Sequence, residues 1–371
     1  MLKKSLAGLY RQVFSVKSSS TNLNFRKLSR RVNMVKDIFI VDTRCHLNKS
    51  ISKAFTKLGY EAKVATGFHG VPDEILKQAH GYTAICVFVN KKISPEQVEI
   101  LKDNGNKLIL CCSAGFDNIP LEQCKAAGIR VGRVPSYSPS SIAEYAVSSI
   151  MALAKNIQKS YELTKTADFT IGGLQCMLLE DKVAGIIGTG LIGKKCVQKI
   201  SGLVSKVLCF DAYPANDWIK TIPNAEYVPL EQLLAEANII SIHVPLLPET
   251  HHMINTENIN KMKKDVIIVN TSRGEIVNTP DLVEGLKSGK IFGVALDVFE
   301  GEKAFMFKDM TKVGYEHYPE LQELTSMHNV IISSHIAFYT DESVKQITEK
   351  TLRNFKGFIG ESEVDEKAFV A

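Results

Sequence analysis

Four polar residues in the second half of the chain stand where apolar, strand-like runs give way to loops: Arg273, Asp297, Glu302 and His335. All four follow one Gly-rich turn at residues 188–193. A cation can bind a carboxylate, an imidazole can pass a proton to a carbonyl oxygen, and a Gly-rich turn can hold the phosphates of a dinucleotide. The combination indicates hydride transfer between a nicotinamide cofactor and a small keto acid.

The Gly-rich turn has the spacing Gly188-x-Gly190-x-x-Gly193, and it lies between an apolar run and a helical pattern. In such a turn the first glycine permits the tight bend, the second lets a pyrophosphate approach, and the third allows close packing of helix on strand. Asp211 ends the next apolar run, near the spacing of about 20 residues typical of the acid that binds a ribose 2′-hydroxyl. A carboxylate there would repel a 2′-phosphate, which predicts NAD rather than NADP. The alternative is an ordinary turn residue.

Arg273 and His335 each follow the end of an apolar run. The arginine fork can bind a carboxylate with two hydrogen bonds, which lysine cannot do. Of the nine histidines, only His335 and His243 follow a strand at the predicted ligand edge, and His243 is expected to shape the cofactor wall. Either Glu300 or Glu302 could bond the imidazole and fix its tautomer. Taken singly, each charge could equally be a solvated surface residue.

Two series of apolar runs alternate with helical patterns, as parallel sheets with crossover helices require. The first series has predicted strands at 37–41, 84–89 and 107–111, and predicted helices at 48–58, 95–101 and 120–127. The second series has predicted strands at 183–187, 207–210, 239–242, 266–269, 294–296 and 330–332. A long helix capped by Ser141 is expected to connect the two. The last helix is predicted at 341–358, and residues 359–371 are expected to form a loosely held tail.

The charges are unevenly distributed. The first acid is Asp37, whereas eight Lys or Arg residues precede Met34. This acid-poor, amphipathic stretch is typical of a mitochondrial or related organelle-targeting leader, expected at 1–34. The alternatives are a cytoplasmic protein with a basic tail, or translation from Met34. Without the leader the net charge changes from +5 to −3, which gives no reason to expect nucleic-acid binding.

The composition limits the other classes of function. No apolar run approaches the roughly 18 residues of a membrane span. The eight cysteines show no spacing typical of a metal site, so none is expected. They are interpreted as buried apolar residues in a reducing compartment, although the adjacent Cys111 and Cys112 could form a redox pair.

From about residue 35 to 358 the chain resembles the NAD-dependent D-2-hydroxyacid dehydrogenases, and within them the members that act on D-lactate. Seven ordered motifs carry the resemblance, and they lie at 113–119, 137–144, 188–193, 243–245, 270–274, 296–302 and 335–340. The resemblance implies reduction of pyruvate, or alternatively of a bulkier 2-keto acid. A third possibility is a non-catalytic NAD-sensing scaffold, against which the complete set of polar residues argues.

The resemblance also assigns roles to residues. Arg273 would bind the substrate, and Glu302 would pair with the acid/base His335. The remaining substrate contacts would come from Gly115, Phe116 and Tyr137. The residues expected to contact NAD are Gly188, Gly190, Leu191, Ile192, Gly193, Asp211, Val244, Pro245, Thr250, Thr271, Ser272, Arg273 and Asp297, the last at the nicotinamide side.

The implied fold is α/β, with two doubly wound parallel-sheet domains and a cleft between them. A Rossmann NAD-binding domain is expected at 136–335, and a discontinuous, flavodoxin-like substrate domain at 35–135 and 336–371. The resemblance further implies a homodimer formed through the NAD-binding domain. The chain departs from several relatives in the insert at 303–328 and in Phe338, where others carry Tyr.

Overall fold

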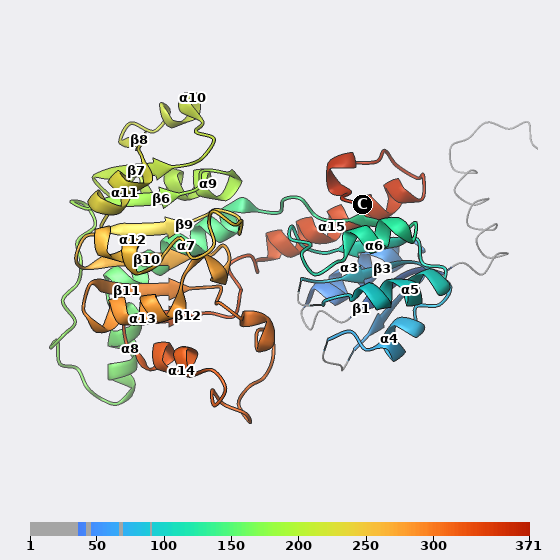
Figure 1. The fold of residues 1–371 in the computed structure, drawn as a ribbon, viewed down its shortest axis with the longest axis horizontal. Coiled ribbons are helices and arrows are strands. Elements are labelled where there is room, and N and C mark those ends of the chain that lie inside the picture. Colours follow the sequence, from blue (N-terminus) through green and yellow to red (C-terminus); the bar gives the residue numbers. More distant parts are fainter. Residues whose placement is uncertain (1–35, 42–45, 67–69, 90) are drawn as a thin grey trace, which may run out of the picture. The chain divides into compact units, whose positions relative to one another are not determined.

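The computed structural model describes residues 36–41, 46–66, 70–89 and 91–371. The targeting leader expected at 1–34 lies outside these residues. The described chain divides into two compact units (Figure 1). The first contains the residues up to Arg133 together with Thr351–Ala371, and the second is Val134–Lys350.

The first unit is built on a five-stranded sheet in which every pairing is parallel. The strands are β1 (Lys36–Val41), β2 (Ala62–Ala65), β3 (Tyr82–Val87), β4 (Leu108–Cys111) and β5 (Arg130–Gly132). Their order, β2-β1-β3-β4-β5, is the flavodoxin-like one. The three predicted strands are confirmed. The prediction missed β2 and β5, which are short edge strands and bear exposed or half-buried charged residues.

Helices cover both faces of this sheet. They are α3 (His46–Lys57), α4 (Asp73–Lys77), α5 (Pro95–Asp103), α6 (Leu121–Ala126) and the end of α15 (Asp341–Phe358). Leu76, Leu101 and Cys124 bring α4, α5 and α6 into one core cluster with the strands. The rings of Phe55 in α3 and Phe355 in α15 pack with their centres 5.1 Å apart. Cys86, Cys111 and Cys112 are buried, as expected of apolar core residues.

The second unit holds a seven-stranded parallel sheet with the order β12-β11-β10-β9-β6-β7-β8, the doubly wound arrangement of dinucleotide-binding domains. The strands are β6 (Val183–Ile187), β7 (Lys206–Phe210), β8 (Ala225–Tyr227), β9 (Ile239–Ile242), β10 (Val266–Asn270), β11 (Ile291–Leu296) and β12 (Val330–Ile332). All six predicted strands are present. The seventh, β8, was missed because it is a three-residue edge strand without a buried residue.

Two helical layers enclose the second sheet. The helices are α7 (Pro139–Ala154), α8 (Ile157–Lys165), α9 (Leu191–Ile200), α10 (Asn216–Ile219), α11 (Leu230–Glu236), α12 (Thr256–Lys261), α13 (Thr279–Lys287) and α14 (Pro319–Ser326), with 3-10 turns η1 (Gly274–Ile276) and η2 (Glu302–Ala304). Buried residues of α7, α9 and α10 share one core cluster with the sheet. Those of α11 to α14 share another. Both faces of every central strand are therefore buried, which explains the continuous apolar runs.

Helix α7 does not begin as predicted. Its N-cap is Ser138, which has a left-handed backbone (φ 31°) and makes no side-chain cap bond. Ser141 lies inside the first turn, where its hydroxyl bonds the hydroxyls of Thr340 at 2.8 Å and Ser343 at 3.2 Å. These bonds join the start of α15 to α7. Residues 336–350 therefore group with the second unit, whereas the sequence assigned them to the substrate domain, and the division falls within α15.

The C-terminal segment is not a loosely held tail. After a short 3-10 turn, η3 (Glu366–Ala368), it pairs with β5 through an antiparallel bridge between Gly132 and Phe369. The Val131 amide donates to the Ala371 carbonyl at 3.0 Å, and the Val370 amide donates to the Val131 carbonyl at 2.9 Å. The polar composition of the segment concealed this pairing, because backbone groups make it.

Candidate active site

Three loops at the carboxyl ends of neighbouring strands carry the predicted catalytic residues. Asn270 at the end of β10 pairs in register with Leu296 at the end of β11, and Leu296 pairs with Ile332 of β12. Arg273 follows the first strand, Glu302 the second and His335 the third. Because parallel strands end at one edge of the sheet, the fold gathers these loops where doubly wound sheets bind ligands.

Glu302 and His335 form a direct pair. The Nδ1 atom of His335 lies 2.8 Å from Oε1 of Glu302, and the two side chains are 21% and 15% exposed. The other carboxylate oxygen, Oε2, accepts the Phe299 amide at 2.8 Å. With the Nδ1 proton directed to Glu302, the imidazole presents Nε2, to which no described residue bonds. A histidine held in this way can pass a proton through Nε2.

Asp297 holds the loop that carries His335. Its Oδ1 atom accepts the Ser333 hydroxyl at 2.6 Å and the Ile336 amide at 2.8 Å, and its Oδ2 atom accepts the Ala337 amide at 2.9 Å. His335 itself has a left-handed backbone, with φ 55°. Such a conformation persists only where its surroundings hold it. The buried carboxylate of Asp297 supplies that restraint on both sides of His335.

The turn bearing Arg273 is fixed by Asn270, which is fully buried. The Asn270 amide nitrogen donates to the Arg273 carbonyl at 2.7 Å, and its oxygen accepts the Ser272 amide at 3.0 Å. The next residue, Gly274, lies directly against the Phe299–Glu300 peptide, since an added Cβ would come within 2.1 Å of the Phe299 carbonyl carbon. The Arg273 loop and the turn that bears Glu302 are therefore in backbone contact.

The two glutamates that the sequence left open have different partners. Glu302 bonds His335, whereas Glu300 bonds His252 through an Oε1–Nε2 contact of 2.6 Å. Hydrogen bonds from His252 and Thr279 outweigh the opposing effect of burial and lower the pKa of Glu300. His252 was not predicted from the sequence, because its partner lies 48 residues away.

Aromatic rings surround the His335 imidazole. Phe307, from the insert at 303–328, stacks on it with ring centres 6.1 Å apart, and Phe338 meets it edge-on at 6.4 Å. Tyr137 packs against Phe338 at 6.0 Å. Burial raises the pKa of Tyr137 to about 12, against an opposing effect of the Arg273 charge. Tyr137 therefore stays protonated at neutral pH. The positive charge of Arg273 interacts with its hydroxyl group.

The Gly-rich turn between β6 and α9 fits a dinucleotide. An added Cβ at Gly193 would lie 1.9 Å from the Gly188 carbonyl oxygen, so helix and turn are in close contact. At Gly190 an added Cβ would meet nothing within 4 Å, which leaves open space beside the turn. Gly190 is also the N-cap of α9 and provides no side-chain cap, so amides of the first helical turn remain available to an anion. Leu191 is exposed and Ile192 is half-buried in that turn.

Asp211 follows β7 and holds the same turn. Its Oδ2 atom accepts the Thr189 amide at 2.5 Å and the Thr189 hydroxyl at 2.9 Å, and its Oδ1 atom accepts the Tyr213 amide at 2.8 Å. Although burial opposes the shift, these bonds lower the pKa of Asp211. The ionised carboxylate therefore stands beside the Gly-rich turn, where a ribose would follow the pyrophosphate.

Two buried polar atoms near these turns have no partner among the described residues, namely His243 Nδ1 and the Thr271 hydroxyl. His243 bonds Ser241 through Nε2 at 2.9 Å, and burial lowers its pKa to about 4, so the ring is neutral at physiological pH. Buried polar atoms normally have hydrogen-bond partners. A polar ligand at this edge could provide them.

The other residues expected to contact NAD make contacts within the second unit. The Thr250 hydroxyl donates to the Pro245 carbonyl at 2.6 Å and accepts the Leu247 amide at 2.8 Å, closing the loop after β9. The Ser272 hydroxyl donates to the Ile242 carbonyl at 2.7 Å. Val244 lies against the first glycine, because an added Cβ at Gly188 would come within 2.8 Å of its side chain.

Gly115 and Phe116, the expected carboxylate-binding pair, lie in the first unit after β4. The Gly115 carbonyl accepts the Ser113 hydroxyl at 2.7 Å. Arg133 donates to the Ala114 carbonyl at 2.9 Å, and its guanidinium lies 5.2 Å from the centre of the Phe116 ring. This loop is thus held by its own unit.

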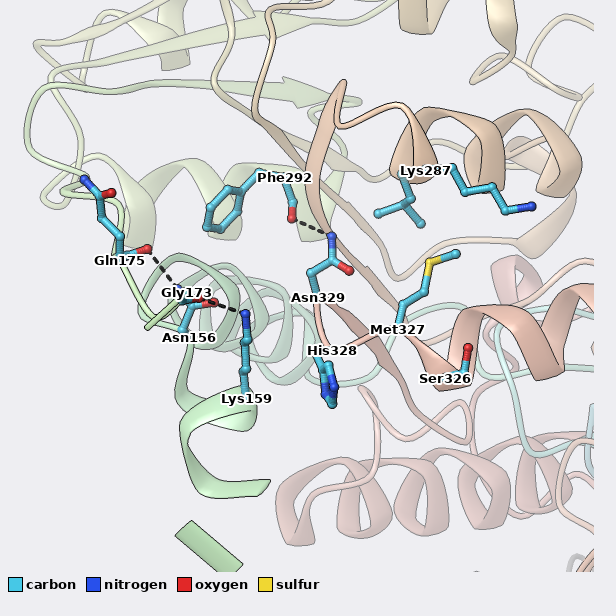
Figure 2. Close-up of a pocket in the computed structure, with 11 residues that line it drawn as sticks. Asn156, Lys159, Gly173, Gln175, Lys287, Phe292, Ser326, Met327, His328 and Asn329 are labelled. Atoms are coloured by element: carbon cyan, nitrogen blue, oxygen red, sulfur yellow. Dashed lines mark hydrogen bonds between the residues drawn. The ribbon is translucent and has the colours of Figure 1, made fainter. Parts of the chain in front are cut away.

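The second unit also contains a pocket that includes none of the predicted residues. The lining residues are Asn156, Lys159, Gly173, Gln175, Leu286, Lys287, Phe292, Ser326, Met327, His328 and Asn329 (Figure 2). Lys159 donates to the Gly173 carbonyl at 2.8 Å, and Lys287 pairs with Glu323 at 2.6 Å. Both lysines of the pocket are thus bonded to other parts of the second unit. No helix among the described residues is long and apolar enough to cross a membrane.

Comparisons with known proteins place the chain in one family. Residues 147–337 match the model of the NAD-binding domain of the D-isomer specific 2-hydroxyacid dehydrogenases. D-lactate dehydrogenase of Escherichia coli is 37% identical over 282 residues, which cover 76% of this chain and 85% of that protein. An aromatic 2-oxoacid reductase of Clostridium sporogenes is also 37% identical, over 76% of this chain and 84% of its own. The solved structure of the pyruvate reductase of Chlamydomonas reinhardtii is 31% identical, with a TM-score of 0.83, over 89% of this chain and 98% of its own.

Proposed function

Because the chain belongs to the D-isomer specific 2-hydroxyacid dehydrogenases, which are NAD-dependent oxidoreductases acting on CH–OH groups, we propose that it interconverts pyruvate and D-lactate. The similarity to a D-lactate dehydrogenase and to a pyruvate reductase supports this substrate. The observation that carries the proposal is the Glu302–His335 pair, which fixes Nδ1 and leaves Nε2 for a substrate oxygen.

The mechanism follows from the two charged loops. NADH, when bound, supplies the hydride that adds to the keto carbon. Arg273 binds the carboxylate of the keto acid with its two-pronged guanidinium and draws electron density from the carbonyl. The imidazolium of His335 donates its Nε2 proton to the carbonyl oxygen, which becomes the hydroxyl. Glu302 stabilises the positive imidazolium and keeps Nδ1 protonated. In the reverse direction the neutral ring accepts the hydroxyl proton.

Steady-state kinetics on the purified protein test the substrate. The expected result is NADH consumption with pyruvate, stoichiometric formation of D-lactate, and a lower kcat/KM for 2-ketobutyrate and 2-ketoisocaproate. If pyruvate gives no turnover with NADH while another 2-keto acid does, pyruvate is not the substrate. L-lactate as the product would contradict the proposed handedness.

A bulkier 2-keto acid is the second candidate substrate. Two observations support it: an aromatic 2-oxoacid reductase is as similar in sequence as the D-lactate enzyme, and Phe338 stands at the imidazole instead of Tyr. Stacking of Phe307 on His335 favours the smaller substrate, because the ring takes up space beside the imidazole. Phenylpyruvate therefore belongs in the substrate panel, and a kcat/KM above that of pyruvate would favour the second candidate.

We also propose that the chain forms a homodimer through the second unit. Large apolar side chains are exposed in α8 and the segment after it, with Tyr161 at 60%, Phe169 at 78%, Ile171 at 87% and Leu178 at 56%. A concentrated set of exposed apolar residues is typical of a protein interface. Light scattering should give twice the mass of the chain, and Phe169→Asp with Ile171→Asp should shift it toward the monomer. A monomeric wild-type protein would contradict the proposal.

For localisation we propose a mitochondrion or related organelle, on the acid-poor composition of residues 1–34. A fusion of residues 1–36 to a fluorescent protein should enter the organelle. A diffuse cytoplasmic signal would favour the alternative, a cytoplasmic enzyme.

A further inference from the structure

A second histidine–glutamate pair is built on the same turn as the Glu302–His335 pair. His252 Nε2 lies 2.6 Å from Glu300 Oε1, and both side chains are half-buried. The two glutamates are separated only by Gly301, whose left-handed backbone (φ 75°) allows a sharp change of direction. One turn thus presents adjacent carboxylates to two histidines.

The hydrogen bonds of His252 exclude it as an acid or base. Asn278 caps α13, and its Oδ1 atom accepts the Asp281 amide at 3.1 Å. The Asn278 amide nitrogen is therefore the donor in its 3.3 Å contact with His252 Nδ1. It follows that the His252 proton lies on Nε2 and is donated to Glu300. Both ring nitrogens are occupied, whereas His335 keeps Nε2 for the substrate.

The pair connects the segments that carry Arg273 and Glu302. Besides His252, Glu300 accepts the Thr279 amide through Oε2 at 3.2 Å, at the start of α13. The His252 amide donates to the Glu275 carbonyl at 2.9 Å, in η1 directly after Arg273. His252 has a left-handed backbone (φ 51°), which requires restraint from its surroundings.

We propose that His252 and Glu300 form a positioning clamp that sets the Arg273 loop against the Glu302–His335 pair. The clamp fixes the distance between the group that binds the carboxylate and the group that protonates the carbonyl oxygen. It therefore acts on the keto acid and leaves the Gly-rich turn of the cofactor site untouched. The inference rests on the proposed function, because Arg273 and His335 must act on one substrate.

A double-mutant cycle tests the clamp. His252→Phe and Glu300→Met each remove the contact, and we expect each to lower kcat/KM for the keto acid by about tenfold. The kcat/KM of the double variant should lie within about twofold of that of the less active single variant, because both changes break the same interaction. His252→Gln keeps a donor toward Glu300 and should restore activity to within about threefold of wild type. The dissociation constant of NADH should stay within about twofold in all variants.

The matched control is Glu323→Gln, which breaks the 2.6 Å ion pair with Lys287 at the far end of α13. It should leave kcat/KM unchanged. The proposal is overturned if the single variants keep wild-type kcat/KM, if their effects multiply in the double variant, if NADH binding weakens as much as kcat/KM, or if His252→Gln is as impaired as His252→Phe.

A second measurement is independent of turnover. The Phe299 amide donates to Glu302, so its hydrogen exchange reports the position of that carboxylate. Exchange should accelerate at least about tenfold in His252→Phe and Glu300→Met, but not in Glu323→Gln. Unchanged exchange would overturn the clamp. If the wild type reduces no 2-keto acid, the proposed function fails, and the exchange data still decide whether the clamp exists.

Discussion

Asp297→Asn is expected to loosen the loop that carries His335. The carboxylate accepts three hydrogen bonds through two oxygens, from Ser333, Ile336 and Ala337. An asparagine has one oxygen, so in either orientation its NH₂ group faces at least one donor. The Ala337 amide is the donor that loses its acceptor if the oxygen stays toward Ser333. Asp297 and Ala337 are both buried, at 2% and 3% exposure, so water cannot replace the missing bond.

The free-energy cost follows from these contacts. Losing a hydrogen bond to a charged acceptor costs about 1.5–3 kcal/mol, and an unsatisfied buried donor adds about 1–3 kcal/mol. We expect Asp297→Asn to lower the free energy of unfolding by about 2.5–6 kcal/mol, which corresponds to a Tm decrease of roughly 5–24 °C for a unit of this size. The kcat should fall roughly 10- to 100-fold, because His335 would no longer be held at the reacting oxygen.

Thermal denaturation and steady-state kinetics, with Ser333→Ala as the comparison, check this prediction. Ser333→Ala removes a donor and leaves the carboxylate with two partners, so it should cost only about 1 kcal/mol. Its kcat should stay within about threefold of wild type. The reasoning is refuted if the two variants have the same Tm, or if Asp297→Asn keeps more than about half of the wild-type kcat.

Three further predictions concern His243, Asp211 and Arg273. Burial holds the pKa of His243 at about 4, below its value of 6.5 in the unfolded chain, so the unfolded state gains the proton first. The free energy of unfolding should therefore fall by about 3 kcal/mol as the pH decreases from about 6.5 to about 4. Urea titrations at a series of pH values should show that His243→Gln loses less unfolding free energy than the wild type as the pH decreases. An equal loss in the two proteins would count against this prediction. Asp211→Ala should reduce the preference for NADH over NADPH in kcat/KM at least about tenfold, and undiminished discrimination would exclude the ribose role. Arg273→Lys should raise KM for pyruvate and lower kcat/KM by roughly 100-fold; a change of less than about threefold would argue against a two-pronged contact.

The sequence predicted best where a physical cause acts over a few adjacent residues. Strands buried on both faces are apolar at nearly every position, so β6, β9 and β10 could be identified directly. Their carboxyl ends then located the loops of Arg273 and His335. The Gly-rich turn was equally visible, because Gly188 and Gly193 are required by contacts that exclude a Cβ.

Features that depend on distant partners could not be predicted. Glu302 bonds the predicted acid/base His335, whereas Glu300 bonds His252. Neither histidine is near its glutamate in the sequence, so the sequence could not distinguish the two glutamates. Ser141 has a residue type that caps helices, yet it bonds Thr340, which lies 199 residues away. The pairing of the C-terminal segment with β5 uses backbone groups, which leave no mark on the side-chain pattern.

The most direct test of the central claim is single-turnover hydride transfer by His335→Gln beside the wild-type protein. When the NADH complex of the wild type is mixed with pyruvate, the absorbance of the reduced nicotinamide should disappear in one rapid phase, and D-lactate should form. His335→Gln should bind NADH with a dissociation constant within about twofold of wild type, yet transfer hydride at least about 1,000-fold more slowly, because no group protonates the carbonyl oxygen. Transfer at more than about half the wild-type rate would contradict the account.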